Sequence, residues 1–93
     1  MNRLVLQAQV LERAAARYTP AGLPALDMVL KHESTATEDG QARKVSLEIR
    51  AVAIGDVTRQ VGQLAVGAQA QFAGFLAASR NGRGLVFHVT AIA

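Results

Sequence analysis

The sequence predicts a small all-β domain, a five-stranded barrel with one short helix between its third and fourth strands. Three observations support this fold. Five segments alternate apolar and polar residues with the period of a β-strand. One stretch repeats apolar residues at helical spacing, and turn-forming residues separate the segments. The length of 93 residues suits one domain, which we expect to span 1–93.

The first strand is predicted over Arg3–Glu12. It places four apolar residues on one face: Leu4, Leu6, Ala8 and Val10. The run Ala14–Ala16 has helical propensity, but three residues cannot nucleate a helix, so we interpret it as the frayed end of this strand. Two prolines and a glycine in Thr19–Pro24 then predict a turn.

The second and third strands are predicted over Ala25–Glu33 and Arg43–Ile54. Each alternates between an apolar and a polar face, and the third becomes apolar on both faces after Arg50, as expected where a strand is covered on both sides. The polar segment between them, Ser34–Ala42, is predicted to be an exposed, mobile loop. Its Asp39-Gly40 pair is a hairpin-turn signal.

The helix is predicted to follow the third strand, with Asp56 as its N-cap. Its apolar face consists of three residues: Val57, Val61 and Leu64. Gly62 weakens the helix, so we expect one to two turns that end at Val66-Gly67.

The fourth and fifth strands are predicted over Gln69–Ser79 and Leu85–Ile92, with Asn81-Gly82 as a two-residue hairpin signal. Gly74 inside a strand predicts a bulge or a bend at a barrel corner. Of the three phenylalanines, Phe72 and Phe87 are interpreted as core residues; Phe75 lies on the opposite face from Phe72, and burial is favoured over an outward position. The resulting order of elements is that of an oligonucleotide-binding (OB) barrel.

The composition narrows the classes of function. The chain has no cysteine, which excludes disulfides and thiolate metal sites. Its two histidines, His32 and His88, lie in predicted strands without a cysteine or carboxylate cluster at metal-ligand spacing. We therefore expect no catalytic site, no metal and no cofactor, and we disfavour a small enzyme or an oligosaccharide binder. The chain shows no signal-peptide pattern and no membrane-spanning apolar run, so we expect a cytoplasmic protein.

The charge balance permits binding to a polyanion. The chain has ten Lys and Arg residues and seven Asp and Glu residues, which gives a net charge of +3. Arg43-Lys44 follow the long polar segment, while Arg80 and Arg83 flank the last predicted turn. OB folds bind nucleic acid through such loops and through the face of strands two and three. Tyr18, beside Arg17, is the one aromatic residue that we consider for base stacking. Backbone contacts of this kind predict binding without sequence specificity.

Several short segments match a known family in order and register: Asn2–Leu6, Pro20–Pro24, Val29–His32 followed by Ser34, Val66-Gly67 leading to Gly74-Phe75, and Asn81-Gly82. Together they span nearly the whole chain, which resembles the primosomal replication protein N (PriB) family, small relatives of the bacterial single-strand-binding proteins. The resemblance implies an OB-fold homodimer that binds single-stranded DNA during replication restart. It also implies contacts with the restart helicase and with further primosome proteins. We interpret the first strand as the edge along which two copies would pair.

By position, the family's cationic DNA contacts fall on Arg17, Arg80, Arg83 and Arg43, and Lys31 lies in a matching segment. The chain departs from the family at three positions. Gln41 and Ser46 stand where relatives carry aromatic residues, and Glu33 stands at a basic position. Two functions therefore remain open: a single-stranded-DNA-binding accessory protein of the primosome, and a protein-interaction adaptor of the same fold with weak or no DNA binding.

Overall fold

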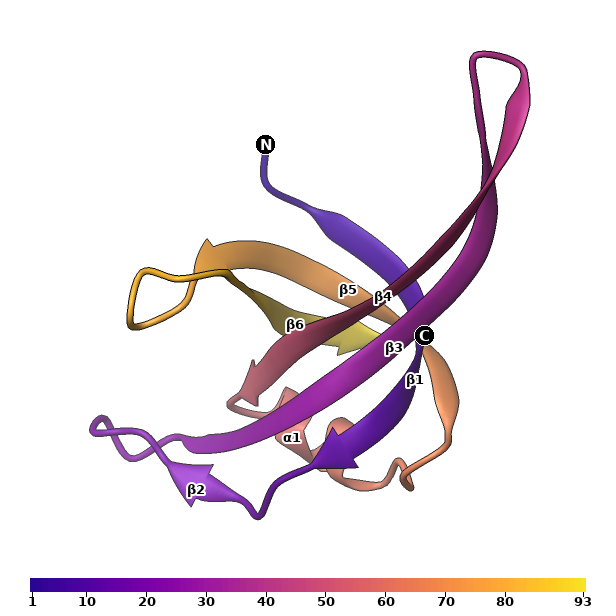
Figure 1. Ribbon diagram of the computed structural model, residues 1–93. Coiled ribbons are helices and arrows are strands. Elements are labelled where there is room, and N and C mark those ends of the chain that lie inside the picture. The colour runs from indigo at the N-terminus through magenta and orange to yellow at the C-terminus, as the bar shows by residue number, and fades with distance from the viewer.

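The computed structural model describes all residues from 1 to 93, and its strands form one sheet that curls into a barrel (Figure 1). The elements are β1 (Leu4–Arg13), β2 (Arg17–Tyr18), β3 (Pro24–Glu38), β4 (Gln41–Ile54), α1 (Val57–Gly62), β5 (Gln69–Ala78) and β6 (Leu85–Ile92). The strand order is β1-β5-β6-β4-β3-β2, and an added pairing of β1 with β3 closes the barrel. Only β4 and β6 pair in parallel. The predicted five-stranded OB barrel with its short helix is confirmed, and β2 is an extra two-residue strand at its rim.

The core fills the barrel with the inward side chains of every long strand. Phe72 and Phe87 are fully buried, which confirms their assignment. The helix covers one end of the barrel (Figure 1), where Val61 is buried and its predicted apolar neighbours pack against the core. The favoured burial of Phe75 is wrong. Phe75 is 38% exposed and its ring stacks on His88 outside the barrel, because three steps along a strand reverse the face.

Gly74 lies at an irregularity in the pairing of β5 with β6, as the sequence predicts. Ala73 pairs with Ala91 and Gly74 with Val89, so the extra residue of this bulge, Thr90, is on β6. A Cβ atom at Gly74 would lie 1.7 Å from the carbonyl oxygen of His88, so only glycine allows the two strands to approach. This approach keeps the barrel closed beside the buried Phe72.

The predicted loop Ser34–Ala42 is instead a continuation of two strands. Strand β3 runs to Glu38 and β4 starts at Gln41, so only Asp39 and Gly40 form the turn, both with positive φ. Backbone hydrogen bonds alone can hold two strands together, because every residue carries a donor and an acceptor on its main chain. Polar residues can therefore extend β3 and β4 where both faces of the two-stranded ribbon are exposed to water. We call residues 34–45 the arm. It projects from the barrel and makes the molecule 49 Å long (Figure 1).

The helix begins after Asp56, as predicted, but it ends earlier than predicted. It has six residues and ends at Gly62, before the predicted Val66-Gly67. Asp56 occupies the N-cap position, but its side chain makes no capping hydrogen bond because its backbone is already helical. The Thr58 hydroxyl donates to the Gly55 carbonyl at 2.7 Å instead. No helix in the structure is long and apolar enough to cross a membrane.

The segment after β1 is more ordered than a frayed strand end. Strand β1 ends at Arg13, Ala14–Ala16 belongs to no strand, and β2 pairs with Pro24 and Ala25 of β3. The predicted turn lies inside this small hairpin, where the Thr19 amide donates to the Leu23 carbonyl at 2.8 Å. Arg17 and Tyr18 thus lie on a paired strand and not on a free loop.

Candidate nucleic-acid interface

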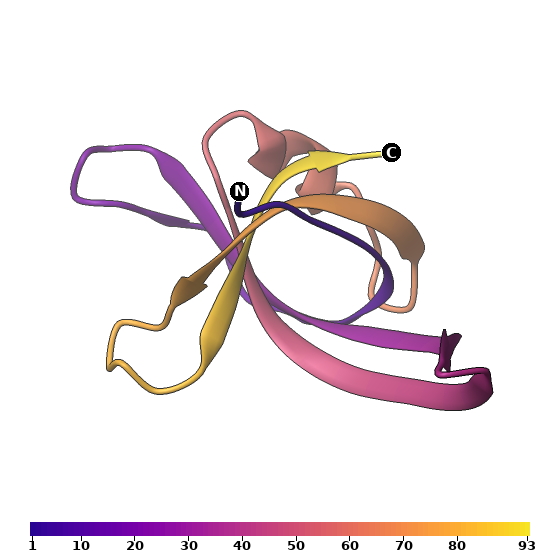
Figure 2. The same cartoon turned by 90° about the horizontal axis from the view of Figure 1, so that it is seen from above.

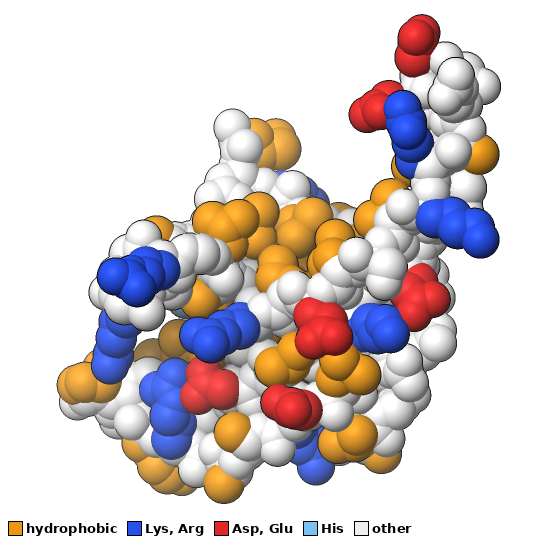
Figure 3. Space-filling model, in the orientation of Figure 1, with side chains coloured by type: hydrophobic (Ala, Val, Ile, Leu, Met, Phe, Trp, Pro, Cys, Tyr) orange, Lys and Arg blue, Asp and Glu red, His pale blue; other side chains and the backbone are white.

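A groove runs between the β3–β4 strands and the connection from β5 to β6. Its first part has a volume of about 390 Å³ and is lined by Glu12, Ala14, Asp27, Met28, Val29, Arg50, Ser79, Arg80 and Val86. Its second part has a volume of about 560 Å³ and is lined by Leu47, Glu48, Ile49, Arg50, Ser79, Asn81, Arg83, Gly84 and Leu85. The two parts share Arg50 and Ser79, so we treat them as one groove. Figure 3 shows cationic and anionic side chains interspersed over this side of the molecule.

The connection from β5 to β6 is a folded loop of six residues, 79–84, and not the predicted two-residue hairpin. The Asn81 side-chain oxygen accepts hydrogen bonds from the Ser79 hydroxyl at 2.6 Å and from the Arg83 amide at 2.9 Å. Gly82 closes a turn by donating to the Ser79 carbonyl at 2.9 Å, with φ at 71°. These bonds order the loop, in which Arg80 lines the first part of the groove and Arg83 lines the second.

Arg50 is a groove residue that the sequence analysis did not select. It lies on β4 opposite Val29 of β3 and Val86 of β6, and it lines both parts of the groove. The alternation of β4 was the available signal, because it places Arg50 outward on the strand whose face OB folds use. The three groove arginines, Arg50, Arg80 and Arg83, form no ion pair within 4.0 Å.

Arg17 is held by a carboxylate on β3. Its Nε donates to Asp27 Oδ2 at 2.6 Å and its Nη2 to Asp27 Oδ1 at 3.0 Å. These hydrogen bonds lower the pKa of Asp27 below its ordinary value, chiefly by favouring the charged carboxylate. The pair neutralises much of the charge that Arg17 would offer to a phosphate. Its neighbour Tyr18 is 74% exposed on β2 and is free to stack.

Arg43 and Lys44 lie on the arm and line neither part of the groove. Arg43 Nε is 3.4 Å from Glu38 Oε1 across the arm, whereas Lys44 is exposed and unpaired. Figure 1 shows the arm and the β5–β6 connection extending in different directions from the barrel. The predicted cations therefore form separate groups, with the groove arginines in one and the arm residues in another.

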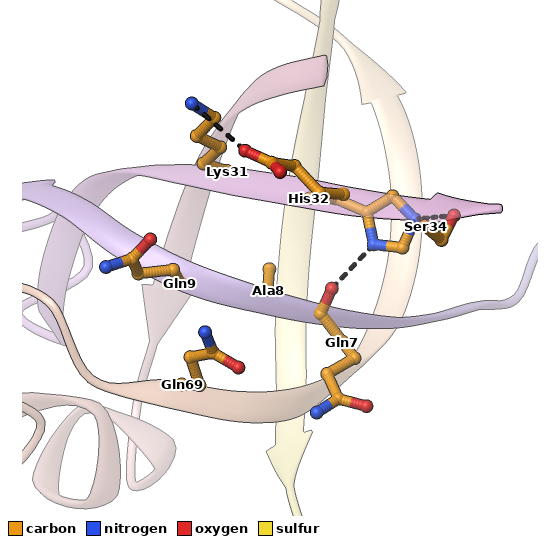
Figure 4. Close-up of a pocket in the computed structure, with 8 residues that line it drawn as sticks. Gln7, Ala8, Gln9, Lys31, His32, Ser34 and Gln69 are labelled. Atoms are coloured by element: carbon orange, nitrogen blue, oxygen red, sulfur yellow. Dashed lines mark hydrogen bonds and ion pairs between the residues drawn. The ribbon is translucent and has the colours of Figure 1, made fainter. Parts of the chain in front are cut away.

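Lys31 lines a different hollow, where β1 leaves β3 (Figure 4). Its Nζ is 3.2 Å from Glu33 Oε1. Glu33, which stands at a basic position of the family, thus forms an ion pair with Lys31. Beside it, His32 Nδ1 donates to the Gln7 carbonyl at 2.6 Å and Nε2 accepts from the Ser34 hydroxyl at 2.7 Å. His32 thus links β3 to β1 just beyond their last backbone pair.

The groove contains no aromatic side chain. Phe75 and His88 stack with ring centroids 4.8 Å apart, but they lie on the outer face of β5 and β6. A strand of nucleic acid in this groove would meet arginines, carboxylates and aliphatic side chains. The arrangement suits charge attraction and hydrogen bonding more than base stacking.

Comparison with known proteins shows which families this chain resembles in sequence. A model of a family described as another single-strand binding protein family matches residues 2–91. The replication restart protein PriB of Bordetella pertussis is 50% identical over 81 residues, which cover 87% of this chain and 76% of that protein. The replication restart protein PriB of Nitrosomonas europaea is 32% identical over 89 residues, which cover 95% of this chain and 82% of that protein.

The solved structures include a similar barrel. The structure of PriB from Ralstonia solanacearum superposes with a TM-score of 0.91 at 36% identity, over 100% of this chain and 96% of that one. The fold, the order of the elements and the similarity in sequence thus point to the same group of proteins.

Proposed function

Because this chain belongs to the family of the replication restart protein PriB, a group of single-strand-binding proteins, we propose that it binds single-stranded DNA as a non-enzymatic accessory protein of replication restart. The observation that carries the proposal is the groove with three unpaired arginines, Arg50, Arg80 and Arg83. Lys44 on the arm and Tyr18 on β2 would add contacts outside it. The paired cations, Arg17, Lys31 and Arg43, would contribute when phosphates displace their carboxylates.

Charge attraction sets the expected behaviour of the complex. Each phosphate neutralised on a single strand contributes roughly −0.7 to the slope of log K against log salt concentration. Contacts by the three groove arginines and Lys44 would therefore give a slope of roughly −3. With few stacking contacts, affinity should fall steeply as salt rises.

The test is a titration of labelled oligo-dT by fluorescence anisotropy at several salt concentrations. Replacing Arg80 and Arg83 together by alanine should weaken binding and reduce the slope by about 1.4, since two phosphate contacts are lost. Arg50→Ala should reduce the slope by about 0.7. Arg59→Ala is the matched control, because Arg59 is an exposed arginine of α1 that lines neither part of the groove. Unchanged slopes in the groove variants would remove these arginines from the site.

The adaptor function remains the second candidate, because the groove lacks aromatic residues and carries the carboxylates of Glu12, Asp27 and Glu48. We propose the restart helicase and further primosome proteins as partners in either case. Oligonucleotide titrations that stay flat, together with micromolar binding of the helicase by the full chain, would favour the adaptor over the DNA-binding function.

We further propose that the chain forms a homodimer through β1. Strand β1 pairs with β5 over Leu4–Gln9 but with β3 only from Gln9 onward. Residues 4–8 therefore present one edge without a neighbouring strand, and such an edge can pair with a second chain.

A further inference from the structure

The first part of the groove has the features of a base-binding pocket. Its volume of about 390 Å³ falls in the range of small-molecule pockets, roughly 300–1,000 Å³. Three aliphatic residues line it with side chains that are at least partly exposed: Ala14, Val29 and Val86. They lie over the buried Met28 and offer an apolar surface to a ring. Arg50 and Arg80 lie at the same pocket and can hold the phosphates on either side of an inserted base.

Two carboxylates also line this pocket, and they differ in their partners. Asp27 accepts two hydrogen bonds from Arg17, which occupy both of its oxygens. Glu12 is exposed and has no ion pair and no hydrogen-bond partner in the chain. It follows the irregularity in the pairing of β1 with β3, where Glu12 stands opposite Val29. Glu12 is thus the free acceptor beside an apolar surface.

A free carboxylate in a site for a polyanion has an electrostatic cost, which it offsets only by accepting hydrogen bonds from the bound strand. Phosphates and sugar–phosphate oxygens have no proton to donate, whereas bases do. A carboxylate accepts from the exocyclic amino group of cytosine, which lies at the edge of the ring. Thymine has one donor, its N3–H, and the two carbonyl oxygens that flank this group repel a carboxylate. The chemistry of the pocket therefore distinguishes these two bases.

We propose that this part of the groove receives one base of the bound strand and that Glu12 selects a base with an amino donor, cytosine over thymine. This inference rests on the proposed DNA binding and adds a specificity that backbone contacts alone do not provide. The backbone contacts by themselves predict binding without sequence preference, and this pocket would add a preference at one base.

The experiment compares oligo-dC with oligo-dT of equal length by anisotropy, because both are pyrimidine strands with weak stacking. The wild-type chain should bind oligo-dC at least about tenfold more tightly, the effect of one hydrogen bond to a charged group. Glu12→Gln should weaken oligo-dC binding and leave oligo-dT binding unchanged or stronger, so that the ratio falls below about twofold. A glutamine loses the preference because its amide also donates to the thymine carbonyl.

Glu48→Gln is the matched control. It removes the same charge from the second part of the groove, so it should strengthen binding of both oligonucleotides alike and leave their ratio unchanged. Equal wild-type affinities for the two strands, or a ratio that Glu12→Gln does not change, would overturn the selection by Glu12 while DNA binding stands. Absence of binding to both strands would overturn the proposed function and this inference with it.

Discussion

The seven cations considered for DNA binding fall into two classes according to their neighbours. Arg17, Lys31 and Arg43 each lie within 4.0 Å of a carboxylate on the same sheet. Arg50, Arg80, Arg83 and Lys44 have no such partner. An exposed ion pair adds little stability, but it lowers the net charge that a phosphate meets. A count of Lys and Arg therefore overstates the positive charge available to a nucleic acid, and the unpaired residues are the better guide to the interface.

Asp27→Asn tests this distinction. The substitution should free Arg17, strengthen binding to oligo-dT and steepen the salt slope by about 0.7, because one more cation meets a phosphate. Salt-dependent anisotropy measures both effects. A slope equal to that of the wild type would show that Arg17 contacts no phosphate.

The same substitution should remove a dependence of stability on pH that the wild type has. Arg17 lowers the pKa of Asp27 in the folded chain, so the pair stabilises the fold above the ordinary carboxyl value of about 3.9. That contribution is lost as pH falls through the lowered pKa. Urea unfolding should therefore show the wild type slightly more stable than Asp27→Asn at neutral pH, with the difference vanishing in acid. The difference is small because both side chains are 46% exposed.

At the scale of the elements, the close approach of β5 to β6 depends on one glycine. Gly74→Ala places a Cβ against the His88 carbonyl and should destabilise the chain by about 3 kcal/mol, the cost of overpacking against backbone that cannot move aside. Gly62→Ala is the matched control. No atom lies within 4 Å of the added Cβ there, and alanine favours helix, so stability should stay equal or rise by up to about 1 kcal/mol. Urea denaturation compares the two, and similar losses in both would contradict the steric account.

The arm is an element whose stability is separate from the core. None of its residues belongs to the buried cluster, and its ladder is closed by the Asp39–Gly40 turn. Deleting the two facing pairs Ala36–Arg43 and Thr37–Ala42 keeps the alternation of the ladder and shortens the arm.

The shortened chain should unfold within about 1 kcal/mol of the wild type, as expected for exposed residues. Its salt slope should fall by about 0.7 if Arg43 meets a phosphate. A cooperative loss of the whole fold would show that the arm supports the barrel.

At the scale of the whole molecule, closure of the barrel leaves part of β1 without a neighbouring strand on one side. Residues 4–8 of β1 pair with β5 but not with β3. Val5, on this stretch, is 46% exposed. A small domain with a thin core gains stability by covering such an edge with a second copy.

Val5→Lys should therefore weaken self-association, since a charged side chain at an edge strand opposes pairing. Light scattering over a range of concentrations should show a dimer for the wild type and a larger share of monomer for the variant. Leu23→Lys is the control, because Leu23 is 48% exposed in the turn between β2 and β3, and neither of these strands pairs with residues 4–8 of β1. A wild-type chain that stays monomeric at micromolar concentration would contradict the dimer.

Local pattern determined most of the barrel. Alternation in β3 and β4, the helical spacing of Val57 and Val61, and the glycine at position 74 placed the strands, the helix and the bend near their observed positions. These features depend on the direction in which successive side chains leave the backbone, and that direction repeats along consecutive residues. The same rule failed for the arm, because its polar residues carry no alternation once both faces are exposed.

Only the tertiary structure decided which charges share a surface. Arg50 on β4 and the arginines of the 79–84 loop meet because β4 and β6 pair in parallel, a contact between segments that lie more than thirty positions apart in sequence. The pairing of Arg17 with Asp27, and the freedom of Glu12, likewise depend on which strands become neighbours. The sequence by itself determined the barrel and its core, since burial acts along each strand. Closure of the sheet decided which residues line the groove. It brings together residues that are far apart in the chain, and the spacing of neighbouring residues gives no information about such contacts.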